Sequence, residues 1–208
     1  FEVIDTSGDA FLGGDTFDQR ILEYFVRLWS EKTGTDASIV GHQSVAKLRS
    51  KVETAKQLLS TQQEVMIEID AFCNGEGFSE TLTRSMFEEL NMDLFEETLN
   101  SVEDVLRRSG LTTSDIDKVL VVGGSSKIPK LQQMLRDYFP DNEFLTGIDP
   151  ANAVTYGAAI IGGIMSEPEE QLLYYEFTPL SLGIETVGGE NYHRPTFLCT
   201  YEKVYRSH

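Results

Sequence analysis

The clearest hydrophobic pattern in the chain is an unbroken apolar run at residues 119–122, Val-Leu-Val-Val, followed directly by Gly123 and Gly124. A strand in which no polar residues alternate with the apolar ones is typical of the centre of a parallel sheet, where other elements cover both faces. Apolar residues then recur at helical spacing before Pro140, at Ile128, Leu131, Leu135 and Tyr138. The order predicts a buried strand, a tight glycine turn and a helix that the proline ends.

Earlier segments predict two more helices and a hairpin. One helix follows Gly13 and Gly14, and its apolar stripe is Phe17, Ile21, Phe25 and Leu28. A second helix spans about 44–59, with one apolar side made of Val45, Leu48, Val52, Ala55 and Leu59. Alternating apolar residues over 65–69, matched by a run at 78–83, predict a β-hairpin.

The remaining elements are shorter or follow from local signals. Residues 1–6 have the composition of a short strand, and Ser85-x-x-Glu88 resembles a capping box for a helix that Gly110 ends. Asp149 and Pro150 predict the start of another helix, which contains the small residues Gly157, Ala158 and Ala159. Such small residues allow a neighbouring element to pack closely, although they also occur without that role.

The polar side of the second helix offers one candidate binding surface. Four side chains follow the i, i+3, i+4, i+7 spacing and therefore share one face: Glu53, Lys56, Gln57 and Ser60. One ligand could contact all four. The alternative is a solvated charged face in which Glu53 and Lys56 pair with each other, and the residues alone leave both open.

The glycine turn offers a second candidate surface. Gly123 and Gly124 lack Cβ atoms, so the backbone can press against a ligand. Ser125 or Ser126 could cap the following helix, whose free N–H groups favour an anion, and Lys127 adds a positive charge. The turn therefore suits phosphate or ribose, although many strand-to-helix turns are glycine-rich for geometry alone. Neither a P-loop nor a G-x-G-x-x-G motif occurs.

The charge and composition of the chain exclude several classes of binding partner. The 208 residues carry a formal charge of −17, which argues against binding to nucleic acid or to an anionic membrane surface. The longest apolar stretch, 153–165, is shorter than the roughly 20 residues that a membrane span needs. Scattered cysteine and histidine residues predict no metal site. Because the chain starts at Phe1 without Met, apparently within a strand, we expect a fragment of a longer protein.

Several separate motifs, in one order, resemble the seventy-kilodalton heat-shock chaperone family over residues 1 to about 189. They are Leu-Gly-Gly-Asp-Thr-Phe-Asp at 12–18, Glu-Thr-Ala-Lys at 53–56 with Ser60, Phe-Glu-Glu-Leu-Asn at 87–91, Val-Gly-Gly-Ser at 122–125 with Ile-Pro-Lys at 128–130, Tyr-Gly-Ala-Ala at 156–159 and Thr-Pro-Leu-Ser-Leu-Gly-Ile-Glu-Thr at 178–186. The segments 77–84 and 89–95 more closely resemble the endoplasmic-reticulum member of that family.

The resemblance implies the second lobe of an actin-like ATPase, an α/β (α+β) fold with a mixed sheet, helices and an inserted smaller α+β subdomain. Residues 1–12 and 92–166 would form the lower lobe, and 13–91 the inserted upper subdomain. Residues 167–177 would be an interdomain linker, and 178–208 the start of a peptide-binding β-domain. The adenosine of ATP or ADP would lie between the helix bearing Glu53, Lys56, Gln57 and Ser60 and the turn formed by Gly123, Gly124, Ser125, Ser126 and Lys127.

Some positions depart from the family pattern. Gln57 and Lys127 occupy positions where the family usually has arginine, and there the two guanidinium groups flank the adenine ring. Ala151 and Asn152 occupy positions where the family usually has two acidic residues. The linker differs as well, with Tyr-Tyr-Glu-Phe at 174–177 in place of Leu-Leu-Asp-Val. The family's first phosphate loop, its catalytic groups and most of its Mg²⁺-side residues would precede Phe1. The sequence therefore assigns no catalytic residue, and we expect this chain alone to be inactive as an ATPase.

Three functions remain. The first is an ATP-dependent chaperone, which implies unfolded polypeptides, J-domain co-chaperones and nucleotide-exchange factors as partners of the full-length protein. The second is a non-enzymatic regulator that binds co-chaperones or exchange factors through residues 13–91. The third, a sugar kinase of the same superfamily, leaves residues 172–186 unexplained. The resemblance favours the endoplasmic-reticulum lumen, with the cytoplasm as the alternative.

Overall fold

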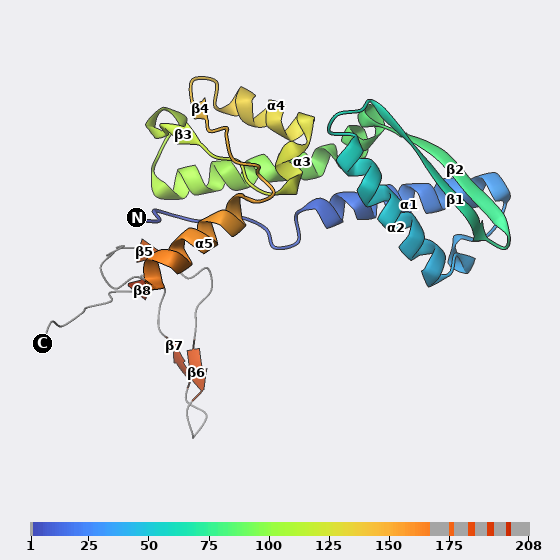
Figure 1. Ribbon diagram of the computed structural model, residues 1–208, viewed down its shortest axis with the longest axis horizontal. Helices are drawn as coiled ribbons and strands as arrows, with labels where there is room; N and C mark the ends of the chain where they lie inside the picture. Colours follow the sequence, from blue (N-terminus) through green and yellow to red (C-terminus); the bar gives the residue numbers. More distant parts are fainter. Residues whose placement is uncertain (1, 167–174, 177–182, 186–190, 194–198, 201–208) are drawn as a thin grey trace, which may run out of the picture.

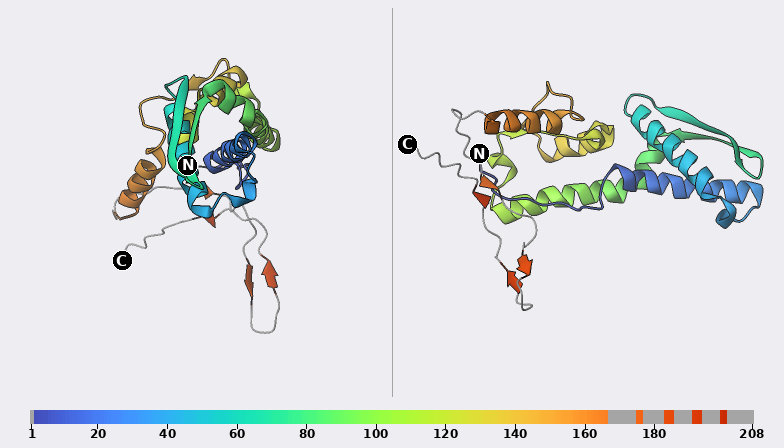
Figure 2. Two further views of the ribbon diagram at one scale, coloured as in Figure 1. Left: turned by 90° about the vertical axis from the view of Figure 1, so that its right-hand side faces the viewer. Right: turned by 60° about the horizontal axis from the view of Figure 1, so that its bottom comes forward.

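The structure, a computed structural model, describes residues 2–166 and the short segments 175–176, 183–185, 191–193 and 199–200. Along residues 2–166 the elements form two groups joined by one long helix (Figure 1). The first group contains two helices and a hairpin, and the second contains a small parallel strand pair with two helices. Figure 2 shows the hairpin at one end of this arrangement and the last two helices at the other.

The first group holds most of the core. Helix α1 (Gly14–Thr33) ends at Gly34, which adopts φ 66° in the left-handed region, and the 3-10 helix η1 (Ala37–Ile39) leads into α2 (His42–Leu58). Aromatic rings pack edge to face inside this group, for example Phe25 against Phe78 with centroids 5.4 Å apart. Most of each predicted stripe is buried: Phe17, Ile21 and Phe25 on α1, and Leu48, Val52, Ala55 and Leu59 along α2 and its C-cap. Leu28 and Val45 are half-buried against this core.

The predicted hairpin is confirmed. Strands β1 (Glu64–Cys73) and β2 (Glu76–Thr83) pair antiparallel, with Ile67 opposite Glu80 and Ile69 opposite Phe78. Ile67 and Ile69 point to the buried side, as the alternation predicts. The register shifts between Ile69 and Cys73, before the turn at Asn74 and Gly75, which both have positive φ.

Helix α3 (Arg84–Ser109) connects the two groups without a break. The predicted capping box at Ser85 and Glu88 is wrong: the N-cap is Thr83, whose hydroxyl accepts a hydrogen bond from the N–H of Met86 at 3.1 Å. Strand β2 runs directly into the helix, so the cap falls on the last strand residue. Gly110 ends the helix at φ 73°, as predicted.

The second group is smaller and more open. Strand β3 (Lys118–Val119) pairs in parallel with β4 (Glu143–Phe144), and the 3-10 helices η2 (Thr113–Asp115) and η3 (Gly124–Lys127) lie before and after β3. Helix α4 (Pro129–Tyr138) follows η3, and α5 (Ala153–Ser166) follows β4. Within the part of the chain that the structure describes, no helix is long and apolar enough to cross a membrane.

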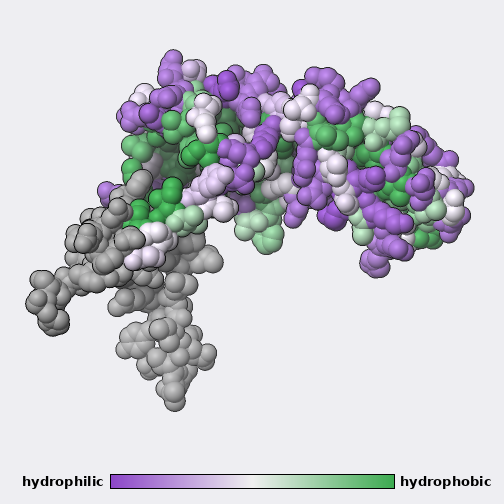
Figure 3. Space-filling view, in the orientation of Figure 1, coloured by the Kyte–Doolittle hydropathy of each residue, from purple (hydrophilic) through white to green (hydrophobic). Residues whose placement is uncertain are grey.

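The prediction of a buried strand at 119–122 is wrong for the structure described. Only Lys118 and Val119 are strand residues, and Leu120 and Val122 are 57% and 44% exposed. The physical reason is the size of the sheet: a two-stranded pair leaves its apolar residues uncovered, whereas a larger parallel sheet would cover both faces. Apolar surface is visible over this group in Figure 3.

The expected strand at the start of the chain is also absent: residues 2–6 form no strand apart from a single bridge residue at Glu2. Of the two roles left open for the small residues of α5, the structure described shows no close contact at Gly157, where nothing lies within 4 Å of a Cβ. The predicted linker at 167–177 lies mostly outside the described residues, which include only its strand β5 (Tyr175–Glu176). Most of the predicted β-domain at 178–208 also lies outside them, and the structure describes only β6 (Gly183–Glu185), β7 (Asn191–His193) and β8 (Cys199–Thr200) of it.

Candidate nucleotide site

The two predicted binding surfaces approach each other at Gly14, the first residue of α1. A Cβ on Gly14 would lie 3.0 Å from Nζ of Lys56 and 3.4 Å from Oγ of Ser125. Lys56 belongs to α2 and Ser125 to η3, which are separated by the hairpin and by the whole of α3. The fold therefore brings one residue from each predicted surface to the same glycine.

Lys56 is held in place by α1. Its Nζ lies 2.6 Å from Oδ2 of Asp18 and 3.2 Å from the carbonyl oxygen of Gly14, to which it donates a hydrogen bond. The side chains of Lys56 and Asp18 are 14% and 4% exposed. Burial raises the pKa of Asp18, and the nearby carboxylates of Glu53 and Asp15 raise it further, while the hydrogen bond and the charge of Lys56 act in the opposite direction.

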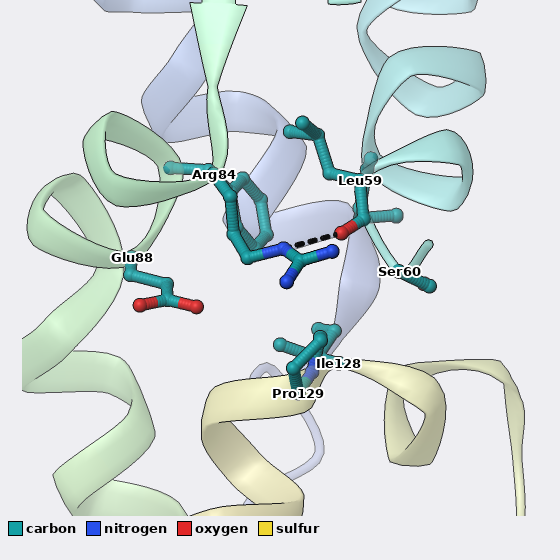
Figure 4. A pocket seen from close by; sticks show the side chains of 8 residues that line it. Leu59, Ser60, Arg84, Glu88, Ile128 and Pro129 are labelled. Carbon is teal, nitrogen blue, oxygen red and sulfur yellow. Dashed lines mark hydrogen bonds between the residues drawn. The ribbon is translucent and has the colours of Figure 1, made fainter. Parts of the chain in front are cut away.

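A small hollow lies beside Lys56 and extends to the start of α4 (Figure 4). Its cavity volume is only about 10 Å³, and it is lined by Lys56, Leu59, Ser60, Arg84, Phe87, Glu88, Ile128 and Pro129. Lys56 on α2 and Ser60, just beyond its C-cap, are two of the four residues of the predicted polar face. Ile128 and Pro129 follow immediately after the predicted glycine turn, so the hollow has one wall from each predicted surface.

Arg84 is a member of this hollow that the sequence reasoning missed. Its Nε donates to the carbonyl oxygen of Leu59 at 2.8 Å, and one terminal nitrogen donates to the carbonyl oxygen of Gln62 at 2.8 Å. Leu59 is the C-cap of α2 and Gln62 lies in the turn that follows, so Arg84 fixes the end of the helix and the turn that contains Ser60. The only indication in the sequence was the predicted hairpin, whose two ends bring residue 84 close to residue 63.

The glycine turn differs from the prediction in one respect. Gly123 has φ 87°, which a residue with a side chain rarely adopts, and its N–H donates to the carbonyl oxygen of Pro150 at 2.7 Å. Neither serine caps α4, because Ile128 is the N-cap and the Ser126 hydroxyl donates to the carbonyl oxygen of Gly123. The capping prediction for Ser125 and Ser126 is therefore wrong. Both serines lie within the 3-10 helix η3, which ends before α4 begins.

The remaining predicted residues lie at the exposed margin. Glu53, Gln57 and Gly124 are exposed, and none of them lines the hollow. Lys127 is 2.8 Å from Oδ1 of Asp149, an exposed pair in which the hydrogen bond from Lys127 lowers the pKa of Asp149. The structure thus brings Lys56, Ser60 and Ser125 toward one place, whereas Lys127 faces Asp149.

The chemistry of the hollow fits one side of a nucleoside. Lys56 and Ser60 supply polar hydrogen-bonding groups, and Ile128 and Pro129 supply an apolar surface of the kind on which a flat base can rest. The cavity volume of about 10 Å³ is far below the roughly 300 Å³ or more typical of a ligand pocket, so a nucleoside would contact these residues from outside the hollow. No group of three or more histidine, cysteine, aspartate or glutamate residues in the described segments is arranged to hold a metal ion.

A mixed α/β arrangement with an inserted hairpin subdomain and a glycine turn at its junction is that of one lobe of an actin-like ATPase. Residues 1–197 match the protein family described as Hsp70 protein, and the chain belongs to the Hsp70 family. It is therefore a chaperone of the Hsp70 type, a family that binds ATP or ADP with Mg²⁺. This membership argues against the sugar-kinase alternative.

Proposed function

We propose that this chain supplies the adenosine-binding side of an ATP-dependent chaperone. The proposed contacts are the nine residues predicted from the sequence: Glu53, Lys56, Gln57, Ser60, Gly123, Gly124, Ser125, Ser126 and Lys127. One observation carries the proposal: Lys56 of α2 and Ser125 of η3 both approach Gly14, although they are far apart in the sequence.

Each wall of the hollow has a separate role in this proposal. The Lys56 ammonium and the Ser60 hydroxyl bind ribose or phosphate oxygens, and the apolar surface of Ile128 and Pro129 supports the base. Arg84 keeps the end of α2 fixed, so that Ser60 stays in position. Bound ATP supplies the free energy that drives cycles of unfolded-peptide binding and release. We assign no catalytic residue to this chain.

The proposal is tested by titrating ADP into the chain and following the heat of binding. Ser60→Ala and Lys56→Met should each weaken binding by about tenfold, equivalent to ~1.4 kcal/mol. Lys51→Met is the matched control, because Lys51 is an exposed lysine of the same helix that does not line the hollow. No detectable ADP binding by the wild-type chain, with folding verified by circular dichroism, would contradict the proposal.

A second candidate function is a non-enzymatic regulator that binds co-chaperones or exchange factors. The observation that favours it is the loss of both adenine-flanking arginines, with Lys127 instead paired with Asp149. An ATPase assay on the complete open reading frame separates the two functions. Turnover that depends on peptide and a J-domain protein supports the chaperone, and its absence supports the regulator.

We also propose the endoplasmic-reticulum lumen as the location, with J-domain co-chaperones, nucleotide-exchange factors and unfolded polypeptides as partners. The location is supported by the resemblance of residues 77–84 and 89–95 to the endoplasmic-reticulum member of the family, and the partners are supported by membership of the Hsp70 family. Fractionation of cells that express the complete reading frame tests the location. Recovery with cytoplasmic markers alone would exclude the lumen.

A further inference from the structure

Asp18 is the one charged side chain in the buried core of the residues that the structure describes, with 3% of its surface exposed. Its Oδ2 pairs with Lys56, while its Oδ1 is buried and has no hydrogen-bond partner in the structure. Burying a carboxylate is costly, and a well-packed apolar pair would often hold two helices together at least as well. A purely structural tie between α1 and α2 therefore does not explain the charge.

The arrangement around Lys56 suggests what the charge does. An ammonium group has three N–H donors. One is used by Asp18 and one by the carbonyl oxygen of Gly14, both of which belong to α1. The third N–H has no hydrogen-bond partner among the described residues, and Lys56 lines the hollow.

The electrostatic surroundings make Asp18 dependent on Lys56. The titratable groups that influence Asp18 are Asp15 on its own helix and Glu53 and Lys56 on α2, so one cation faces three carboxylates. The cation of η3, Lys127, pairs with Asp149. Lys56 is thus the cation that offsets the negative charge of Asp15, Asp18 and Glu53, and its ammonium contacts α1.

We propose that Asp18 is a positioning residue that fixes the Lys56 ammonium against Gly14, so that its remaining N–H faces a nucleotide oxygen. The inference rests on the proposed function, because it names how a residue of that site is oriented. Asp18 does not itself touch the ligand in this arrangement.

The test is ADP titration into the full chain with Asp18→Asn, which keeps the shape of the side chain and removes its charge. We expect the dissociation constant to rise about tenfold at pH 7.5. Asp18→Glu, which keeps the charge, should recover most of the affinity. The matched control is Glu31→Gln, since Glu31 is an exposed acidic residue of α1 that is not among the groups that influence Asp18, and it should leave binding within about twofold.

The pH profile distinguishes positioning from a structural role. As the pH falls through the pKa of Asp18, the wild-type carboxylate becomes neutral, so the wild type and Asp18→Asn should converge in affinity. If Asp18→Asn does not fold, the wild type carries the test alone: the ¹⁵N ammonium signal of Lys56 should be protected from exchange with ADP bound and lose protection together with affinity on acidification.

The outcomes separate the two proposals. ADP binding by the wild type that Asp18→Asn leaves unchanged overturns the role of Asp18 but keeps the proposed function. A difference between the two proteins that is the same at every pH also overturns it, because it indicates a structural effect. No ADP binding by the wild type overturns both.

Discussion

A Cβ atom on Gly14 would lie 3.0 Å from Nζ of Lys56, closer than side chains normally approach. Lys56 cannot simply move aside, because Asp18 holds its ammonium at 2.6 Å. A side chain at Gly14 would therefore have to displace the Lys56 ammonium by a few tenths of an ångström, and Lys56 is a residue of the proposed nucleotide site.

Gly14→Ala should displace Lys56 and weaken ADP binding by about tenfold, or ~1.4 kcal/mol. The chain should still fold, since alanine is a good helix former at this first position of α1. Gly13→Ala is the control: it has nothing within 4 Å of its Cβ and an extended φ of 176°. Equal ADP affinities for the two variants in parallel titrations would show that the Gly14 contact is unimportant.

Phe17→Ala should destabilise the fold by about 3–5 kcal/mol, because a large side chain is removed from a packed core. Phe17 is 1% exposed and meets Phe95 of α3 edge to face, with ring centroids 5.1 Å apart. Phe11→Ala is the comparison, because Phe11 is 87% exposed and its removal should change stability by less than about 0.5 kcal/mol. Urea unfolding followed by circular dichroism measures both.

Thr83→Ala should lower the free energy of unfolding by about 1 kcal/mol, because the hydroxyl caps α3 through the N–H of Met86. Ser85→Ala should have a much smaller effect, since Ser85 is exposed and lies inside the first turn. Thermal unfolding of both variants distinguishes the observed cap from the one that the sequence suggested. A larger loss at Ser85 would contradict the structure.

The double change Gln57→Arg and Lys127→Arg should raise ADP affinity by about tenfold, since a guanidinium group stacks on a base better than an amide or an ammonium does. The structure adds a condition, because Lys127 is paired with Asp149. Asp149→Asn should therefore add to the gain by releasing the new arginine. Titration of the single and double variants measures each step, and no gain from the double change would refute the adenine-stacking role.

Stability should depend on pH through the Arg20–Asp93 pair, whose closest nitrogen and oxygen atoms lie 2.7 Å apart. The hydrogen bond from Arg20 lowers the pKa of Asp93 below 3.8 in the folded state. The pair therefore stabilises the fold above pH 3.8, and this contribution is lost as the pH falls through the lowered pKa.

Asp93→Asn should thus be slightly less stable than the wild type at pH 7 and equal to it at pH 2 in urea unfolding. Because both side chains are largely exposed, about 1 M NaCl should remove most of the difference at pH 7. A difference that persisted at pH 2 would assign the effect to something other than the ion pair.

The helices and the hairpin could be predicted from the sequence because their signals are local. The stripe on α1, the alternation at Val65, Ile67 and Ile69, and the stop at Gly110 each depend on residues within a few positions. The strand at 119–122 was predicted wrongly because its burial depends on other strands of the sheet. A run of consecutive apolar residues indicates that both faces of a strand should be packed against other elements, but it does not show which elements those are.

The site was predictable only in part for the same reason. The spacing on α2 placed Lys56 and Ser60 on one face, and both line the hollow. Arg84 and Asp18 could not be found in this way, because they join the site through contacts with Leu59 and Lys56 that the tertiary fold creates. The pairing of Lys127 with Asp149 likewise depends on the chain returning through β4.

The unbroken course of α3 has a mechanical consequence. Its 26 residues correspond to a rod about 39 Å long, and no glycine, proline or loop interrupts it between Thr83 and Gly110. A rotation of the hairpin end of α3 therefore also moves the end of the helix near β3. The chain crosses between the two groups a second time in the irregular stretch before Gly14. A rotation of one group against the other would bend the chain at this stretch, next to Lys56 and Ser125.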